Sequence, residues 1–294
     1  MRNSFLSFLF YSGILAKTSF PGLDIYTSPK QISLGGAGYL QTSPLSYFSN
    51  QPLYTGSLFS VSLVRYPASI TSQAAGIIIP FMNGVGNFTI GNNTYGTFKG
   101  YDENGVFTKT YSSNDIWMKS AYGKTFNNLP ISIGASSLFI SSNYSNNKFH
   151  MLNFAGSFQV MLDSLNARFG LSFNNIVLPI GDLVIDVKTE IIFSIMKKLA
   201  YLPLNLYLDI LFDYKSLNDI YLGGVFNVNK NLQFKLGSST RKLEQNINKD
   251  LYKSIFGATG FGFCYFMKNF SIDYGLYLYG TGSVSQGLEL GTKF

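Results

Sequence analysis

The sequence predicts an all-β protein, a closed, antiparallel transmembrane β-barrel of a bacterial outer membrane. Many segments of the chain alternate between apolar and polar residues, which is the period of a β-strand. Aromatic residues make up 16% of the 294-residue chain and charged residues only 13%, about half the usual share of roughly 25%. The mean hydropathy is nevertheless only +0.13. A sheet with one face in lipid and the other in water accounts for these observations together.

The distribution of apolar residues argues against transmembrane helices. A helix needs roughly 20 consecutive apolar residues to cross a bilayer. Past the N-terminus, the best candidate is Ile191–Leu211, which is interrupted by Lys197, Lys198, Pro203, Asn205 and Asp209. The membrane is therefore expected to be crossed by strands.

Residues 1–16 have the pattern of a cleaved signal peptide. Arg2 supplies the positive charge, Phe5–Leu15 is a short apolar stretch, and Ala16 is an acceptable cleavage position. An uncleaved membrane anchor is the alternative, but the apolar stretch is too short to span a bilayer. We therefore expect an exported protein.

Residues 17–56 are expected to form a separate N-terminal segment. Within it, Ser28–Tyr54 is rich in Gly, Ser and Pro and does not alternate. A free leader is one interpretation. We instead expect a plug in the lumen or mouth of the barrel, because a wide barrel without a plug would leak small solutes. The candidate plug residues are Leu34, Gly35, Gly36, Ala37, Gly38, Asn50 and Pro52.

Two properties of this segment favour a plug. Its glycines would let the backbone turn tightly and approach the wall closely. Its apolar residues would have no role in a free leader, and they are Ile32, Leu34, Leu40, Leu45 and Phe48. We expect its partners to be polar lumen residues such as Arg168 or Asp209.

Residues 57–294 are expected to form the barrel. In Ala167–Asn174 and Leu204–Asp213, every second residue is apolar and the residues between are mostly polar or glycine. A soluble β-sandwich also alternates, but large residues throughout the apolar face suit a lipid-facing belt better. The residues predicted to face lipid include Phe169, Leu171, Phe173, Leu206, Leu208, Ile210, Leu288 and Leu290. Those predicted to face the lumen are Arg168, Ser172, Asp209 and Glu289.

Further strands and turns follow the same pattern. The Asp102–Gly105 stretch ends in Asn-Gly between aromatic segments, which is a strong hairpin signal. Aromatic residues near segment ends predict girdles at the membrane interfaces, with Tyr101, Phe107, Tyr277 and Tyr279 as candidates. Similar alternation occurs in Leu152–Val160, Leu222–Val228, Leu232–Leu236, Phe261–Tyr265 and Phe270–Leu276.

The C-terminal strand is the most specific local feature. Ser283–Phe294 alternates up to a terminal Phe294, which resembles the signal read by the barrel-assembly machinery. We expect this strand to pair with the first strand near Ser57–Tyr66, because an open edge in lipid would leave unpaired backbone groups. A direct count gives roughly 12 or 13 strands, whereas single-chain barrels normally have an even number.

The sequence predicts no catalytic, metal or cofactor site, and therefore no enzyme. His150, the only histidine, follows the polar Asn146–Lys148 stretch, where we expect a loop or interface residue. The Gly-x-Ser-x-Gly and His-Glu-x-x-His motifs are absent, and Leu34–Gly38 lacks the G-x-G-x-x-G spacing. The 22 Lys and Arg are scattered, so a pI near 9.2 does not indicate nucleic acid. Cys264 is expected to be a small packed side chain.

Several stretches resemble the PorV/PorQ family. Ser28–Gly38, with its Leu-Gly-Gly-Ala core, and Asn50–Leu53 resemble the opening of these proteins, although Gln51 separates the Asn and Pro of the usual motif. The C-terminal Phe261–Gly275 resembles the end of the same group. The stretches that look more like PorQ than PorV are Tyr95–Gly105, Tyr111–Lys124 and Leu162–Leu171.

The resemblance implies a barrel of the FadL type with about 14 strands and an N-terminal segment inside it. It also implies a role in type IX secretion, in which family members bind or hand over secreted proteins at the cell surface. The expected partners are then outer-membrane lipid, the barrel-assembly machinery, other secretion-system proteins and secreted protein substrates.

Two other function classes stay open. One is a FadL-like conduit for hydrophobic small molecules. The other is a structural outer-membrane protein or an enzyme such as a phospholipase. A lateral gap in the wall with an apolar lumen pocket would favour transport, whereas a sealed barrel with large ordered exterior loops would favour protein binding.

Overall fold

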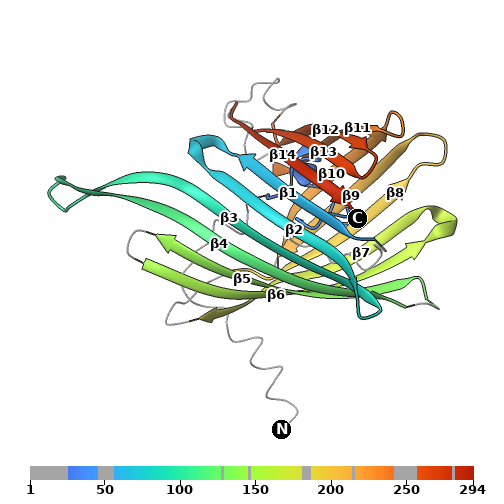
Figure 1. Cartoon of the computed structure of the whole chain (residues 1–294), viewed down its shortest axis with the longest axis horizontal. Helices are drawn as coiled ribbons and strands as arrows, with labels where there is room; N and C mark the ends of the chain where they lie inside the picture. Colours follow the sequence, from blue (N-terminus) through green and yellow to red (C-terminus); the bar gives the residue numbers. More distant parts are fainter. Residues whose placement is uncertain are drawn as a thin grey trace, which may run out of the picture.

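The computed structural model describes residues 26–45, 56–126, 129–144, 147–180, 187–213, 216–241, 257–279 and 282–294. The proposed signal peptide and two plug candidates, Asn50 and Pro52, lie outside these ranges, as does the apolar residue Phe48 of the same segment. Within them, fourteen antiparallel strands form one closed barrel, which confirms the predicted fold class (Figure 1).

Each strand pairs with its neighbours in the sequence, and β14 returns to β1. The strands are β1 (Leu58–Arg65), β2 (Thr71–Phe81), β3 (Gly84–Tyr101), β4 (Phe107–Thr125), β5 (Ile131–Tyr144), β6 (Asn147–Leu162), β7 (Ala167–Ile180), β8 (Glu190–Lys198), β9 (Leu204–Asp213), β10 (Leu217–Asn227), β11 (Leu232–Ser239), β12 (Thr259–Met267), β13 (Phe270–Leu278) and β14 (Val284–Lys293). A short helix, α2 (Pro29–Ser33), precedes them, and two 3-10 turns, Pro67–Ser69 and Asp163–Leu165, follow β1 and β6.

The predicted closure of the barrel is confirmed. Strands β1 and β14 pair without a break from Leu58 opposite Lys293 to Arg65 opposite Gln286. The backbone N–H of Phe294 then donates to the carbonyl of Ser57 over 3.3 Å. All backbone groups along this seam are therefore paired, as a strand in hydrocarbon requires.

The two faces of each strand differ as the alternation predicted. Leu288 and Leu290 in β14 are each 45% exposed on the outer face, whereas Glu289 between them is 0% exposed inside the barrel. In β9, the predicted Leu204–Asp213 strand, Tyr207, Asp209 and Leu211 are buried inside, and the residues between them lie on the outer face.

This register predicts unequal effects of two neighbouring substitutions in β9. Leu208→Lys would place a charge on the lipid face and should cost roughly 2–4 kcal/mol near the midplane. Asp209→Asn keeps an acceptor oxygen inside the barrel and should be mild. Urea unfolding of both variants in vesicles measures the difference, and equal losses would count against the register.

The two ends of the barrel differ in their connections. At the end that holds Phe294, the turns between strands contain two to five residues. At the opposite end, two connections, 181–189 and 240–258, contain nine and 19 residues. Short turns are periplasmic and long loops extracellular in outer-membrane barrels. We therefore refer to the Phe294 end as the periplasmic end and to the other as the extracellular end.

The β3–β4 hairpin projects past the extracellular end (Figure 1). Its predicted turn is confirmed: the Asp102 carboxylate accepts hydrogen bonds from the backbone N–H groups of Asn104 and Val106, and Gly105 has a φ of 77°. Neighbouring strands stop pairing at Thr94 in β3 and Ser113 in β4, so the outer six or so residues of each arm continue alone.

Two girdle predictions are corrected by this arrangement. Tyr101 and Phe107 lie near the tip of the projecting hairpin, beyond the last pairing of the adjacent strands. Tyr277 is buried inside the barrel, because it shares the lumen face of β13 with Asp273 and Gly275. Aromatic content near a strand end therefore did not distinguish a girdle from a lumen contact.

Candidate functional site

The described part of the N-terminal segment, residues 26–45, lies inside the barrel, and we call it the plug segment. At its start, the Tyr66 hydroxyl next to β1 donates to the Tyr26 carbonyl over 2.6 Å. At its end, the Pro44 carbonyl accepts hydrogen bonds from Thr89 (2.5 Å) and Asn87 (3.4 Å) of β3. Between these points α2 contacts β11 to β14. The plug segment therefore starts and ends near β1 to β3 and runs between these points against β11 to β14.

The local sequence explains the single turn of α2. Pro29 occupies the first helical position, where its fixed φ suits a helix and its missing N–H is not needed. The carbonyl of Ser28 accepts from the N–H groups of Gln31 and Ile32, which starts the turn. Gly35, with a φ of 64°, ends it by reversing the chain against the wall.

Glycines in the wall make room for α2. A Cβ atom at Gly237 would overlap the Leu34 carbonyl, and one at Gly260 would overlap the Ile32 carbonyl. A Cβ at Gly287 would lie 2.9 Å from Pro29 Cγ. The wall glycines that face the plug segment in this way are Gly76, Gly170, Gly223, Gly237, Gly260, Gly262, Gly275 and Gly287. The backbone of the plug segment thus rests directly on the backbone of β11 to β13.

The Leu34–Gly38 run lies at the centre of this contact. Leu34 and Ala37 are fully buried in an apolar cluster with wall residues of β8, β9 and β10. A Cβ at Gly36 would meet the Tyr221 ring, and one at Gly35 would lie 2.7 Å from the Gly237 carbonyl carbon. The remaining wall members of the cluster are Ile192, Tyr207, Leu211 and Val225.

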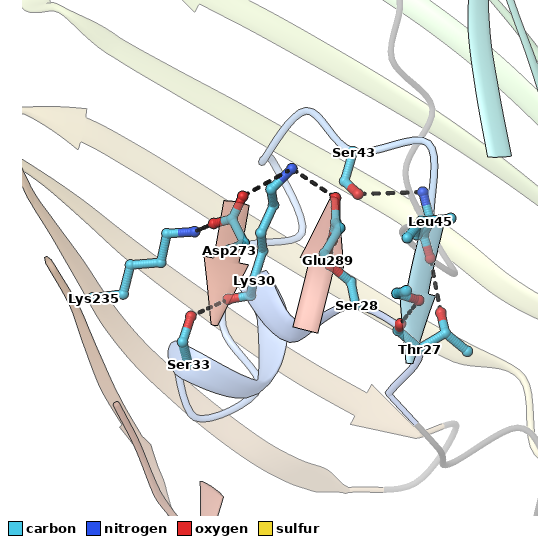
Figure 2. Close-up of polar contacts among 10 residues, drawn as sticks. Thr27, Ser28, Lys30, Ser33, Ser43, Leu45, Lys235, Asp273 and Glu289 are labelled. Atoms are coloured by element: carbon cyan, nitrogen blue, oxygen red, sulfur yellow. Dashed lines mark hydrogen bonds and ion pairs between the residues drawn. The ribbon is translucent and has the colours of Figure 1, made fainter. Parts of the chain in front are cut away.

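A buried ionic network attaches α2 to the wall (Figure 2). The Lys30 ammonium lies 2.8 Å from Glu289 of β14 and 3.6 Å from Asp273 of β13. Lys235 of β11 also pairs with Asp273, and the Ser28 hydroxyl donates to Glu289 over 3.0 Å. Burial alone would lower the pKa of Lys30, but Glu289 and Asp273 raise it above its ordinary value, so Lys30 stays charged.

Asp209 holds the plug segment at a second point. Its carboxylate accepts hydrogen bonds from the backbone N–H groups of Gly38 (2.7 Å) and Tyr39 (3.5 Å). Arg168, the other partner proposed from the sequence, shares the lumen face of β7 with Gly170, which touches Leu40. No hydrogen bond joins Arg168 to the plug segment in the described ranges.

The two ends of the plug segment are joined to each other and to the wall. The Thr27 hydroxyl donates to the Leu45 carbonyl over 2.9 Å (Figure 2). Ser62 of β1 donates to the Thr27 carbonyl over 2.7 Å. Leu45 is buried against Trp117 and Met151 on the opposite wall. Both ends of the segment are thus fixed to the inner surface.

Sequence reasoning missed three of the charged residues in this network, Lys30, Lys235 and Asp273. Asp273 could have been noticed because it lies on the same face of its strand as Gly275 and Tyr277. The signal available was a charged residue on a lumen face opposite a lysine in the non-alternating segment. A pairing across 243 residues of sequence (Lys30 to Asp273) cannot be read from spacing alone.

The single histidine lies in a strand and not in a turn, which corrects that prediction. His150 belongs to β6, where it pairs with Ser141 and stacks on Phe139 with ring centroids 6.0 Å apart. Cys264 is buried and unpaired with any other cysteine, as expected for a packed side chain. Across the described residues, no group of three His, Cys, Asp or Glu is placed to hold a metal ion. No described helix is long and apolar enough to cross a membrane.

Two solved structures share the fold of this chain. A mutant of the TodX monoaromatic hydrocarbon channel is 12% identical with a TM-score of 0.51, and the match covers 92% of this chain and 98% of that one. A FadL homologue of Pseudomonas aeruginosa is 10% identical with a TM-score of 0.53, covering 91% and 98%. No protein-family model and no curated protein sequence matches the chain.

These identities are low enough that the likeness concerns the fold alone. Together with the closed barrel, it identifies the chain as an outer-membrane β-barrel similar to FadL-type channels. The expected FadL-like architecture is thereby confirmed.

Proposed function

We propose that the protein is a conduit for hydrophobic small molecules across the outer membrane, with the plug segment as its gate. The observation that carries this proposal is that residues 26–45 occupy the lumen and contact strands around it: α2 lies against β11 to β14, Gly38 bonds Asp209 of β9, and Leu45 packs with residues of β4 and β6. The strands around them form a closed barrel and not the lateral gap that we expected of a transporter. The route would therefore run along the lumen and open when the plug segment moves.

The way the plug segment is attached suits a gate. Buried ion pairs such as Lys30 with Glu289 are often no more stabilising than apolar side chains of similar volume, because both charges lose their water. A permanent filling would be served equally well by apolar contacts. Charged groups recover their hydration when the lumen opens, which lowers the cost of separating the plug segment from the wall.

The surfaces that the plug segment covers suit apolar solutes. Ile192, Leu211 and Val225 pack against Leu34 and Ala37, and they would line the passage once the segment moved. The fold similarity to the TodX channel, whose name records monoaromatic hydrocarbons, supports the same solute class.

Deletion of Ser28–Leu53 tests the gate. The barrel strands begin at Leu58, so the variant should still insert into membranes. We expect a marked rise in toluene uptake and small-solute permeability of proteoliposomes, because the deletion removes the segment that fills the lumen. Heat-dependent migration on gels verifies the folded barrel. Unchanged permeability of a folded deletion variant would contradict the gate.

A second candidate is a protein-binding role in type IX secretion, which the PorV/PorQ resemblance implies. The observation that favours it is the projecting β3–β4 hairpin, whose aromatic residues form two ring pairs, Phe98 with Tyr111 and Tyr101 with Phe107. An ordered exterior hairpin on a closed barrel is the arrangement expected for protein binding. Affinity purification from outer membranes, with a Tyr101→Ser, Phe107→Ser variant as control, would identify partners that depend on the hairpin.

A further inference from the structure

A hollow of about 740 Å³ lies in the wall of β1 to β4. Two of its lining residues, Ser62 and Ala74, face inward and contact the plug segment, but most of the lining is on the outer face. These four strands are adjacent in the barrel (Figure 1). Three of its lining residues, Leu63, Ile90 and Ile116, are exposed on the outer face. The other outward-facing lining residues are Gln73, Ala75, Asn92 and Asn114.

The hollow exists because one outward position carries a small side chain. Ala75 is paired with Val61 of β1 and with Ile90 of β3, so it stands between two large apolar residues. A methyl group there leaves the space that a larger residue would fill at this level of the lipid belt. Hydrocarbon chains in the membrane would fill such a space, since voids forfeit dispersion contacts.

Amide side chains lie toward the extracellular side of the hollow, in a row that also contains Leu63 and Ile116. Gln73 and Asn92 are direct partners on β2 and β3, and Asn114 lies beyond them on β4. The amide oxygen of Asn92 is buried without a hydrogen-bond partner. Three amides on the outward face of adjacent strands are unusual for a surface in hydrocarbon, because each needs a hydrogen-bond partner.

A cation lies one row beyond Gln73, at the extracellular edge of the hollow. Arg65 ends β1 on the same outer face, opposite Thr71, which is two residues from Gln73. No ion pair to Arg65 occurs within the described ranges. A guanidinium beside amide groups provides the donors that a phosphate group binds.

We propose that this hollow is a binding site for one phosphorylated lipid of the outer leaflet. An acyl chain occupies the space above Ala75, between Leu63, Ile90 and Ile116. The head group lies at the amides, and its phosphate contacts Arg65. The depth order supports this occupant. Ala75 and Ile90 lie nearest the membrane centre, Gln73 and Asn92 follow in a row that they share with Leu63 and Ile116, and Arg65 and Asn114 lie nearest the extracellular end. The proposal does not rest on the proposed conduit.

The test measures retention of diphosphoryl lipid A by the delipidated protein, using native mass spectrometry. Wild type should retain one lipid. Ala75→Phe fills the hollow and should reduce the bound fraction at least tenfold. Ala135→Phe, on the exposed outer face of β5, is the matched control and should bind as wild type does. If Ala75→Phe does not fold, Gln73→Leu tests the polar rim and should also reduce retention.

Two further measurements distinguish recognition of the phosphate group from filling of the hollow by an acyl chain alone. Arg65→Gln should weaken retention of diphosphoryl lipid A about tenfold while leaving that of its dephosphorylated form unchanged. Diacylglycerol, which has no phosphate, should bind no better to wild type than to Arg65→Gln. The proposal is overturned if Ala75→Phe retains lipid as wild type does, if Ala135→Phe loses as much, or if Arg65→Gln has no effect.

Discussion

Gly237→Ala is expected to detach α2 from the wall while leaving the barrel intact. The added methyl group would occupy the position of the Leu34 carbonyl, and both partners are backbone atoms that cannot rotate away. Overpacking of this kind costs about 1–3 kcal/mol or more. The barrel ladder itself is unaffected, since alanine fits an antiparallel strand, so the strain falls on the plug segment.

Maleimide labelling of Ala37→Cys in a Cys264→Ser background measures this detachment. Ala37 is fully buried, so labelling reports opening of the plug segment. Gly237→Ala should raise the labelling rate at least tenfold. Gly156→Ala is the matched control, because a Cβ at Gly156 would have no atom within 4 Å. Equal labelling of the two glycine variants would show that the close contact at Gly237 does not hold the segment.

Lys30→Met is expected to weaken the attachment of the plug segment by about 3–5 kcal/mol, the usual cost of removing one partner of a buried ion pair. Glu289 and Asp273 would then lie buried with Lys235 as the single cation of the network. In the labelling assay this corresponds to an increase of about a hundredfold or more, since 1.36 kcal/mol is a factor of ten.

The matched control for Lys30→Met is Lys188→Met. Lys188 pairs with Asp213 over 2.7 Å, but its side chain is 62% exposed. Exposed ion pairs contribute about 0–1 kcal/mol to stability. This variant should therefore be labelled as slowly as the Ala37→Cys, Cys264→Ser protein without it. A variant that combines Lys30→Met with neutral replacements of Glu289, Asp273 and Lys235 should regain part of the attachment, because no buried charge would then lack a partner.

The barrel was predictable because every strand needs an apolar face toward lipid, and this requirement repeats along the chain. Leu204–Asp213 matches β9 in both bounds, since one face of the strand meets lipid throughout. The direct count of 12 or 13 strands is lower than the fourteen observed, because some strands alternate less clearly. In β5, the outward positions include Ala135 and Ser137, so the apolar alternation that marked other strands is diluted.

The plug contacts were less predictable because each depends on two distant segments. The glycines of Leu34–Gly38 indicated close packing, and the structure places that run against the wall. The complementary glycines, such as Gly237 and Gly260, look like ordinary weak positions in a strand until the plug segment is placed beside them. Tyr277 was misassigned for the same reason, because its partner Ile32 lies in α2.

The central claim is that the plug segment moves to open the barrel, and a reversible cross-link tests it most directly. Cβ atoms at Ala37 and Gly223 would lie 3.1 Å apart, near the ~3.5–4.5 Å of a disulfide. Toluene uptake by proteoliposomes is measured with Ala37→Cys, Gly223→Cys protein in the Cys264→Ser background. The account predicts that uptake stops when the disulfide forms and returns after reduction. Equal uptake by the oxidised and reduced forms would contradict it.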